Sequence, residues 1–228
     1  MGFAHGAADE TREGIAPVGF AQVPAYLVIG LAGLALFIAS PLVGLALFLL
    51  LSAWHFATAR ETGAREARGA VALLAVGGSA LLRPNETAAV FAAITGGSIP
   101  SAFMLTLAFA GAAGAALAII ALFRREHGGA TAIVALALAA LAQPVLAVGA
   151  IFLLAHALPV QREQVARHGA ARVRKAVRWP TAAAALATLL LIVWVLSSPA
   201  SLPYAVALAF GMAIPHMLLD RVEVGPAG

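Results

Sequence analysis

Cysteine is absent from this 228-residue chain, and charged residues make up only 11% of it. Without cysteine the chain has no disulfide, no thiolate metal ligand and no cysteine nucleophile. A metal ion bound here would therefore be held by histidine, aspartate, glutamate or backbone oxygen. A soluble domain carries roughly 25% charged residues, which it needs to cover a water-facing surface. The scarcity of charge excludes an ordinary soluble domain.

Lysine is almost absent too, because 13 of the 14 basic residues are arginine and only Lys175 is not. The net charge is +4, and six of the basic residues fall in the single segment 160–178. These six are Arg162, Arg167, Arg172, Arg174, Lys175 and Arg178. Such a cluster is typical of a juxtamembrane segment attracted to anionic lipid, or of a solvated loop that fixes orientation. It does not resemble a nucleic-acid footprint, so we expect no nucleic-acid partner.

Long apolar segments dominate what is present, since hydrophobic residues make up 62% of the chain. A helix that spans a membrane needs about 20 apolar residues. The segments predict an all-α, polytopic transmembrane bundle of about seven helices, with one integral-membrane domain over residues 1–228. The predicted helices cover residues 23–39, 42–57, 70–82, 101–123, 130–158, 179–196 and 202–219, with a shallow amphipathic piece at 87–95.

Two details of this layout follow from proline and from charge. Pro144 lies inside the long segment 130–158 and is expected to kink that helix, because proline removes a backbone donor. The segment 160–178 is predicted to be a connection between helices. Its basic cluster places it on the cytoplasmic side by the positive-inside rule.

Four of the six histidines lie inside apolar segments: His5, His55, His156 and His216. Ionisable side chains in hydrocarbon usually face the bundle interior and serve a function. Neutral imidazole is also the commonest protein ligand for a transition metal. The pattern therefore predicts a metal site at the bundle core. The bland alternatives are a solvated terminal residue for His5 and an interfacial residue for His55, and no local metal-binding signature decides between them.

The remaining histidines and one carboxylate complete the candidates. Asp9 follows His5 by four residues, and in a helix the two would share a face. Asp9 is then a candidate for orienting the imidazole of His5 by a hydrogen bond, as carboxylates do behind metal-bound histidines. His127 and His168 lie in charged segments and are assigned no role.

Five short motifs occur in order along nearly the whole chain. Together they resemble the motifs of the Brp/Blh family of integral-membrane β-carotene 15,15'-dioxygenases. Each is weakly specific alone, and the ordered set is more specific. The motifs are the segments His5–Asp9 (HGAAD), Ser52–Phe56 (SAWHF), Pro84–Phe91 (PNETAAVF), Phe152–His156 (FLLAH) and Ile214–Leu219 (IPHMLL).

The resemblance implies cleavage of the central double bond of β-carotene, or of a related carotenoid, by O2 to give retinal. It implies ferrous iron, Fe(2+), held by His5, His55 and His156, and we add His216 as a fourth candidate ligand. Trp54, Phe56 and Phe152 are expected to align the polyene. The substrate would enter from the lipid of a bacterial inner membrane, where the chain would be a multi-pass protein.

One departure from the family pattern bears on this expectation. Val160 stands four residues after His156, where the family has the second histidine of an HxxxH pair. The alternative is therefore a non-catalytic relative that binds a carotenoid or retinal. A small transporter is a third interpretation, although few acidic residues lie deep in the predicted helices. A rhodopsin-type pump is disfavoured, because the last predicted helix has no lysine to form a Schiff base with retinal. The oligomeric state stays open.

Overall fold

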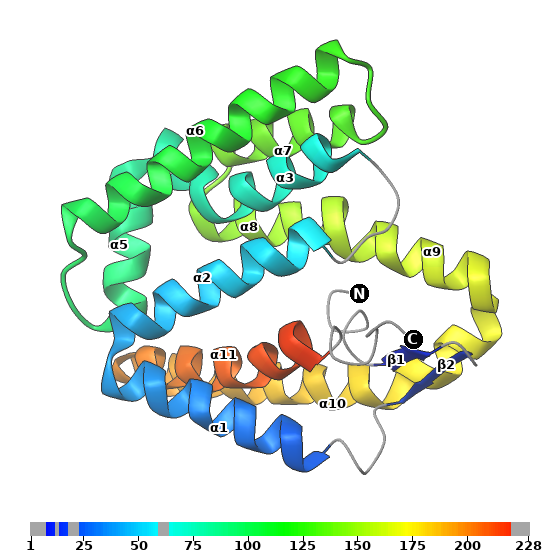
Figure 1. Cartoon of the computed structure of the whole chain (residues 1–228). Helices are drawn as coiled ribbons and strands as arrows, with labels where there is room; N and C mark the ends of the chain where they lie inside the picture. The colour runs from blue at the N-terminus through cyan, green and yellow to red at the C-terminus, as the bar shows by residue number, and fades with distance from the viewer. Residues whose placement is uncertain (1–7, 12–13, 18–22, 59–63, 220–228) are drawn as a thin grey trace. The chain divides into compact units, whose positions relative to one another are not determined.

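The computed structural model describes residues 8–11, 14–17, 23–58 and 64–219 (Figure 1). The chain divides into two compact units by its internal packing. One unit comprises Met1–Phe48 together with Val160–Gly228, and the other comprises Leu49–Pro159. The prediction of one domain over residues 1–228 stays a prediction, because this division concerns packing within each unit.

The first unit contains a short β-hairpin and a closely packed helix pair. Strands β1 (Ala8–Thr11) and β2 (Gly14–Pro17) pair antiparallel. Helix α1 (Val23–Ala39) packs along α11 (Leu202–Leu219), as Figure 1 shows. A Cβ atom added at Gly30 would lie 2.8 Å from the carbonyl oxygen of Gly211, and the reverse holds as well. Glycine at both positions therefore lets the two backbones approach.

Aromatic rings fill the space beside this helix pair. The ring of Phe210 in α11 stacks on that of Phe48 with centroids 3.7 Å apart. Phe37 in α1, which is buried, meets Phe210 edge-on at 5.3 Å. Phe48 belongs to the first part of α2 (Pro41–Thr58). These rings bury a large apolar area, and their edge-on and stacked arrangements are favourable for aromatic pairs.

The basic segment 160–178 is helical, so the prediction of a connection there is wrong. Helix α9 (Leu158–His168) is followed by Gly169 alone, after which α10 (Ala170–Ser197) begins. This segment contains four alanines and five arginines, two residue types that favour a helix. Gly169 has a φ of 81°, a conformation that glycine adopts at no steric cost. One glycine therefore replaces the expected loop.

The second unit is built around α6 (Ser101–Phe123). Helix α3 (Arg65–Leu73), the π-turn η2 (Leu74–Gly78) and α4 (Ser79–Leu82) run on without a break and pack against α6. Helix α7 (Gly129–Leu141) packs against both the α3 segment and α6. The core between them consists mainly of alanine, with Leu74 and Ile151 fully buried. Small side chains thus let three helices lie close together.

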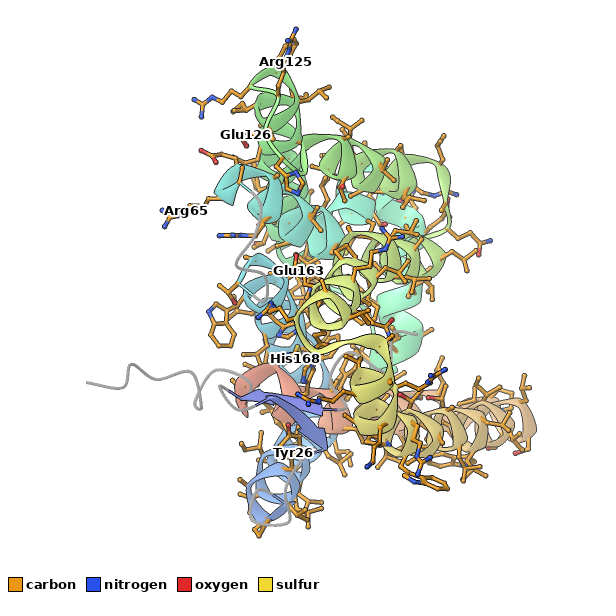
Figure 2. All side chains as sticks on the ribbon, turned by 90° about the vertical axis from the view of Figure 1, so that its right-hand side faces the viewer. Tyr26, Arg65, Arg125, Glu126, Glu163 and His168 are labelled. Atoms are coloured by element: carbon orange, nitrogen blue, oxygen red, sulfur yellow. The ribbon has the colours of Figure 1, made fainter. Side chains whose placement is uncertain are left out.

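Charged side chains gather where α3 begins and α6 ends, around Arg65, Arg125 and Glu126 in Figure 2. The guanidinium of Arg124 lies 3.4 Å from the Glu66 carboxylate and so joins the two helix ends. This end of the second unit carries the polar groups that a membrane–water boundary requires.

The PNETAAVF motif begins helix α5 (Pro84–Thr95). Pro84 occupies the first turn, where a missing N–H costs nothing. The Arg83 guanidinium donates to both carboxylate oxygens of Glu86, at 2.6 and 2.7 Å, and to the Leu141 carbonyl at 3.5 Å. Thr87 donates its hydroxyl to the Arg83 carbonyl at 2.9 Å. The motif thus sets the start of α5 and ties it to the end of α7.

The apolar segment 130–158 forms two helices, so the prediction of one kinked helix is wrong. Helix α7 ends at Leu141, and α8 (Pro144–Ile151) begins at the proline itself. Gln143 is extended, with ψ at 147°, because a residue that precedes proline is disfavoured in the helical region. Proline at the first position then starts a new helix.

Among the described residues, five helices are long and apolar enough to cross a membrane. Two further apolar helices, α1 and α7, are shorter. The predicted all-α fold is therefore confirmed for the described residues, with the β1–β2 hairpin as an exception. The predicted number of seven membrane-spanning helices is not confirmed. The five helices are Pro41–Thr58, Ser101–Phe123, Pro144–His168, Ala170–Ser197 and Pro199–Leu218, the last of which begins with the single turn η4 (Pro199–Ser201).

Candidate functional site

Two histidines predicted as metal ligands meet inside the second unit. The ring centroids of His55 and His156 lie 5.0 Å apart, and the ring planes are inclined at 64°. Both side chains are buried, with 3% and 2% of their surface exposed. His55 comes from the last turn of α2, and His156 from the π-turn η3 (Phe152–Ala157). The fold brings together two imidazoles that are far apart in the sequence.

The π-turn that carries His156 has a local cause in Pro159. This proline lies inside α9, which continues η3 without a break. It lacks a backbone N–H, and its ring crowds the carbonyl of the residue four positions earlier, Ala155. Widening of the preceding turn relieves this conflict, and such π-bulges often mark functional positions. Pro159 therefore accounts for the irregular backbone around His156.

Two phenylalanines line the histidine pair. The ring of Phe56 lies 4.8 Å from that of His156, and the ring of Phe152 lies 5.6 Å from it. The two phenylalanine rings are 5.8 Å apart. Both were predicted to contact substrate, and the structure places both beside His156. Trp54, the third such residue, is 40% exposed on α2, and its role stays a prediction.

The remaining predicted site residues lie elsewhere. His216 is half-buried on α11 in the first unit, directly after Pro215. His5 falls outside the described residues. Asp9 lies in strand β1, so the helical spacing that made it a partner of His5 does not apply. The ligand roles of His5 and His216 stay predictions.

The histidine pair supplies part of a metal-ligand set. Within the part of the chain that the structure describes, no three His, Asp or Glu side chains are grouped so as to hold a metal ion. Two buried imidazoles nevertheless offer nitrogen donors that suit iron. Val160, at the position where the family resemblance expects a histidine, is buried and apolar. The donor chemistry of His55 and His156 fits iron, with further ligands required.

Ser52 is a buried polar residue that was not among the predicted site residues. Its side chain is 7% exposed, and it precedes His55 by three positions on α2. Residues three apart on a helix lie on the same face. A serine three residues before a histidine, inside an apolar helix, is the signal that would have marked Ser52 as a candidate site residue.

A known protein family matches nearly the whole chain. The family described as Beta-carotene 15,15'-dioxygenase matches residues 1–222 of the chain. No curated protein and no solved structure matches it. The family match covers all five motifs, including the two that contribute His55 and His156. The chain therefore belongs to the β-carotene 15,15'-dioxygenase family.

Proposed function

We propose that the protein cleaves β-carotene, or a related carotenoid, at its central double bond with O2 and yields retinal. Membership of the family supports this activity. The structural observation that carries it is the buried pair His55 and His156, with ring centroids 5.0 Å apart. One oxygen atom enters each of the two aldehydes formed, so the reaction needs no further reductant.

The histidine pair is proposed to hold ferrous iron. Imidazole is a suitable donor for iron, and the chain has no cysteine to compete as a soft ligand. When bound, iron would supply the activation of O2. His5 and His216 are proposed as further ligands, and the iron content of each alanine variant tests them one at a time. The protein itself contributes two imidazoles that are buried and so shielded from water.

Phe56 and Phe152 are proposed to orient the polyene. Their rings face His156 at 4.8 and 5.6 Å and present apolar surfaces to a conjugated hydrocarbon. A carotenoid has no polar group at its centre, so shape and apolar contact must fix its position. The substrate is proposed to enter from the lipid, because the apolar helices are long enough to cross a membrane. A bacterial inner membrane is the proposed location.

The proposed activity is tested by pigment analysis of a β-carotene-producing bacterium that expresses the chain, with an empty vector as control. We expect the orange cells to bleach and two molecules of retinal to appear for each molecule of β-carotene lost. Unchanged β-carotene in cells whose membranes contain the protein would contradict cleavage of this carotenoid.

A carotenoid- or retinal-binding protein without catalysis is the second candidate. It is favoured by Val160, which is buried and apolar where the family pattern has a histidine. The two candidates differ in metal content and oxygen uptake. An enzyme purified with its iron should consume one O2 for each carotenoid lost, whereas a carrier should bind the polyene without consuming oxygen.

Replacing Phe56 with alanine is expected to lower carotenoid cleavage roughly tenfold and to leave the iron content unchanged. The substitution removes the ring nearest to His156, and a poorly positioned polyene reacts slowly. Retinal formed per mole of protein and iron per mole of protein are the two measurements.

The matched control for this substitution is Phe109→Ala, because Phe109 is 68% exposed on α6. It should cleave carotenoid at the rate of the unchanged protein. Loss of iron in Phe56→Ala would show that Phe56 supports the histidines instead of the substrate. An unchanged cleavage rate in Phe56→Ala would remove it from the site.

A further inference from the structure

The first turns of α10 have one buried side and one exposed side. Val173, Ala176 and Val177 are buried and pack with Val165 of α9. Their spacing of three and four residues places them on a single helix face. Helix α10 also contacts the β1–β2 hairpin in the same unit. The apolar face thus already has its partners within the first unit.

The exposed side of the same turns is strongly basic. We call it the basic face, and it consists of Arg172, Arg174, Lys175 and Arg178. Helix α10 contains no acidic residue over its whole length. Cations near a helix N-terminus are unfavourable to the helix dipole. A bound anion would relieve both the mutual repulsion of these cations and their conflict with the dipole.

Trp179 marks the boundary between the basic face and a long apolar stretch. Its side chain is 71% exposed, and the Arg178 guanidinium carbon lies 5.4 Å from the centre of its ring. Beyond it, α10 exposes apolar side chains such as Leu186 at 58% and Leu196 at 77%. Tryptophan followed by an exposed apolar helix is typical of a membrane–water interface. This arrangement predicts that the basic face lies at the level of lipid headgroups.

We propose that the basic face of α10 binds the phosphate groups of anionic phospholipids. The charge of the face, the absence of acidic residues on α10 and its continuity with an exposed apolar span all favour this ligand. A cation at a lipid surface strengthens association with anionic lipid roughly fivefold. Anionic lipid would thereby hold the N-terminal end of α10 at the surface of one leaflet, independently of the carotenoid chemistry.

The test measures how lipids distribute around Trp179 in the full-length protein. The substitutions Trp54→Phe and Trp194→Phe leave Trp179 as the only tryptophan. The protein is placed in phosphatidylcholine vesicles, and brominated phosphatidylglycerol or brominated phosphatidylcholine quenches its fluorescence. We expect phosphatidylglycerol to be preferred at least roughly threefold, with a preference that weakens as salt is added.

Two comparisons locate the effect. Arg172→Gln, Arg174→Gln and Lys175→Gln together should remove the preference, while Arg65→Gln, Arg124→Gln and Arg125→Gln together should keep it. A protein with Trp194 as its only tryptophan should show no preference, because about 22 Å of helix separate it from Trp179. This comparison needs no change of charge, so it holds even if the glutamine variant fails to fold.

The proposal is overturned by any of three results. Equal quenching by the two lipids at Trp179 would show that the face does not select anionic headgroups. An unchanged preference in the α10 glutamine variant would place the selection elsewhere. An equal preference at Trp194 would show a general affinity of the protein for anionic bilayers.

Discussion

Replacing His55 with alanine is expected to lower retinal formation at least roughly hundredfold, while the protein still inserts into the membrane. His55 is 3% exposed, and its ring centroid lies 5.0 Å from that of His156. Loss of groups that merely orient metal ligands already costs ten- to hundredfold, so loss of a ligand should cost at least as much. Retinal formed per mole of membrane-inserted protein is the measurement.

His127→Ala is the matched control, because His127 is exposed in the turn after α6. It should form retinal at the unchanged rate. Retinal formation by His156→Ala should fall as far as that by His55→Ala. The double variant should form hardly less, since the effects of residues that act as one unit are not additive. Retinal output at the unchanged level from His55→Ala would remove this residue from the mechanism.

Iron content, measured together with the amount of protein in the membrane, separates loss of metal binding from loss of the fold. Alanine at a buried position leaves a cavity and costs some stability by itself. Both histidine variants should lose iron, yet remain in the membrane fraction in amounts similar to His127→Ala. A variant that keeps its iron and loses activity would assign His55 to a role other than metal binding.

The boundaries of three helices could be predicted from the sequence because their ends carry strong local signals. Helices α1, α6 and α11 have the predicted bounds, 23–39, 101–123 and 202–219. Long apolar runs that end at proline, glycine or charge leave little choice of boundary. The start of α10 was missed, because a cluster of cations suggested a loop although alanine and arginine favour a helix.

The candidate site could be predicted only in part. His55 and His156 stand out in the sequence because each is a polar residue within an apolar run, and each lies in a family motif. Their approach to 5.0 Å depends on how the second unit packs, and no local pattern encodes that distance. The π-turn at His156 was likewise not predicted. Pro159 signals a disturbance, but not whether the helix breaks or widens.

Replacing Gly111 with alanine is expected to destabilise the second unit by about 3 kcal/mol, the upper part of the range for overpacked cores. A Cβ atom at this position would collide with the carbonyl oxygen of Gly77 and lie 2.7 Å from the carbonyl carbon of that residue. Both are backbone atoms of the π-turn η2, so no side-chain rotation can make room. The α6–η2 crossing must therefore open, and the contacts of the alanine core beside it weaken.

Gly149→Ala is the matched control, because Gly149 also lies within a helix of the second unit, α8, but has no atom within 4 Å of an added Cβ. Alanine there should leave stability unchanged or raise it by up to ~1 kcal/mol, since glycine is the weaker helix former. Thermal unfolding of the purified proteins in detergent measures both changes. Equal melting temperatures for the two variants would mean that the α6–η2 crossing tolerates a methyl group, and that close backbone contact at Gly111 does not hold this unit together. A clear fall in melting temperature for Gly111→Ala alone would instead show that the close contact between Gly111 and Gly77 holds the second unit together. This is the unit that carries His55 and His156.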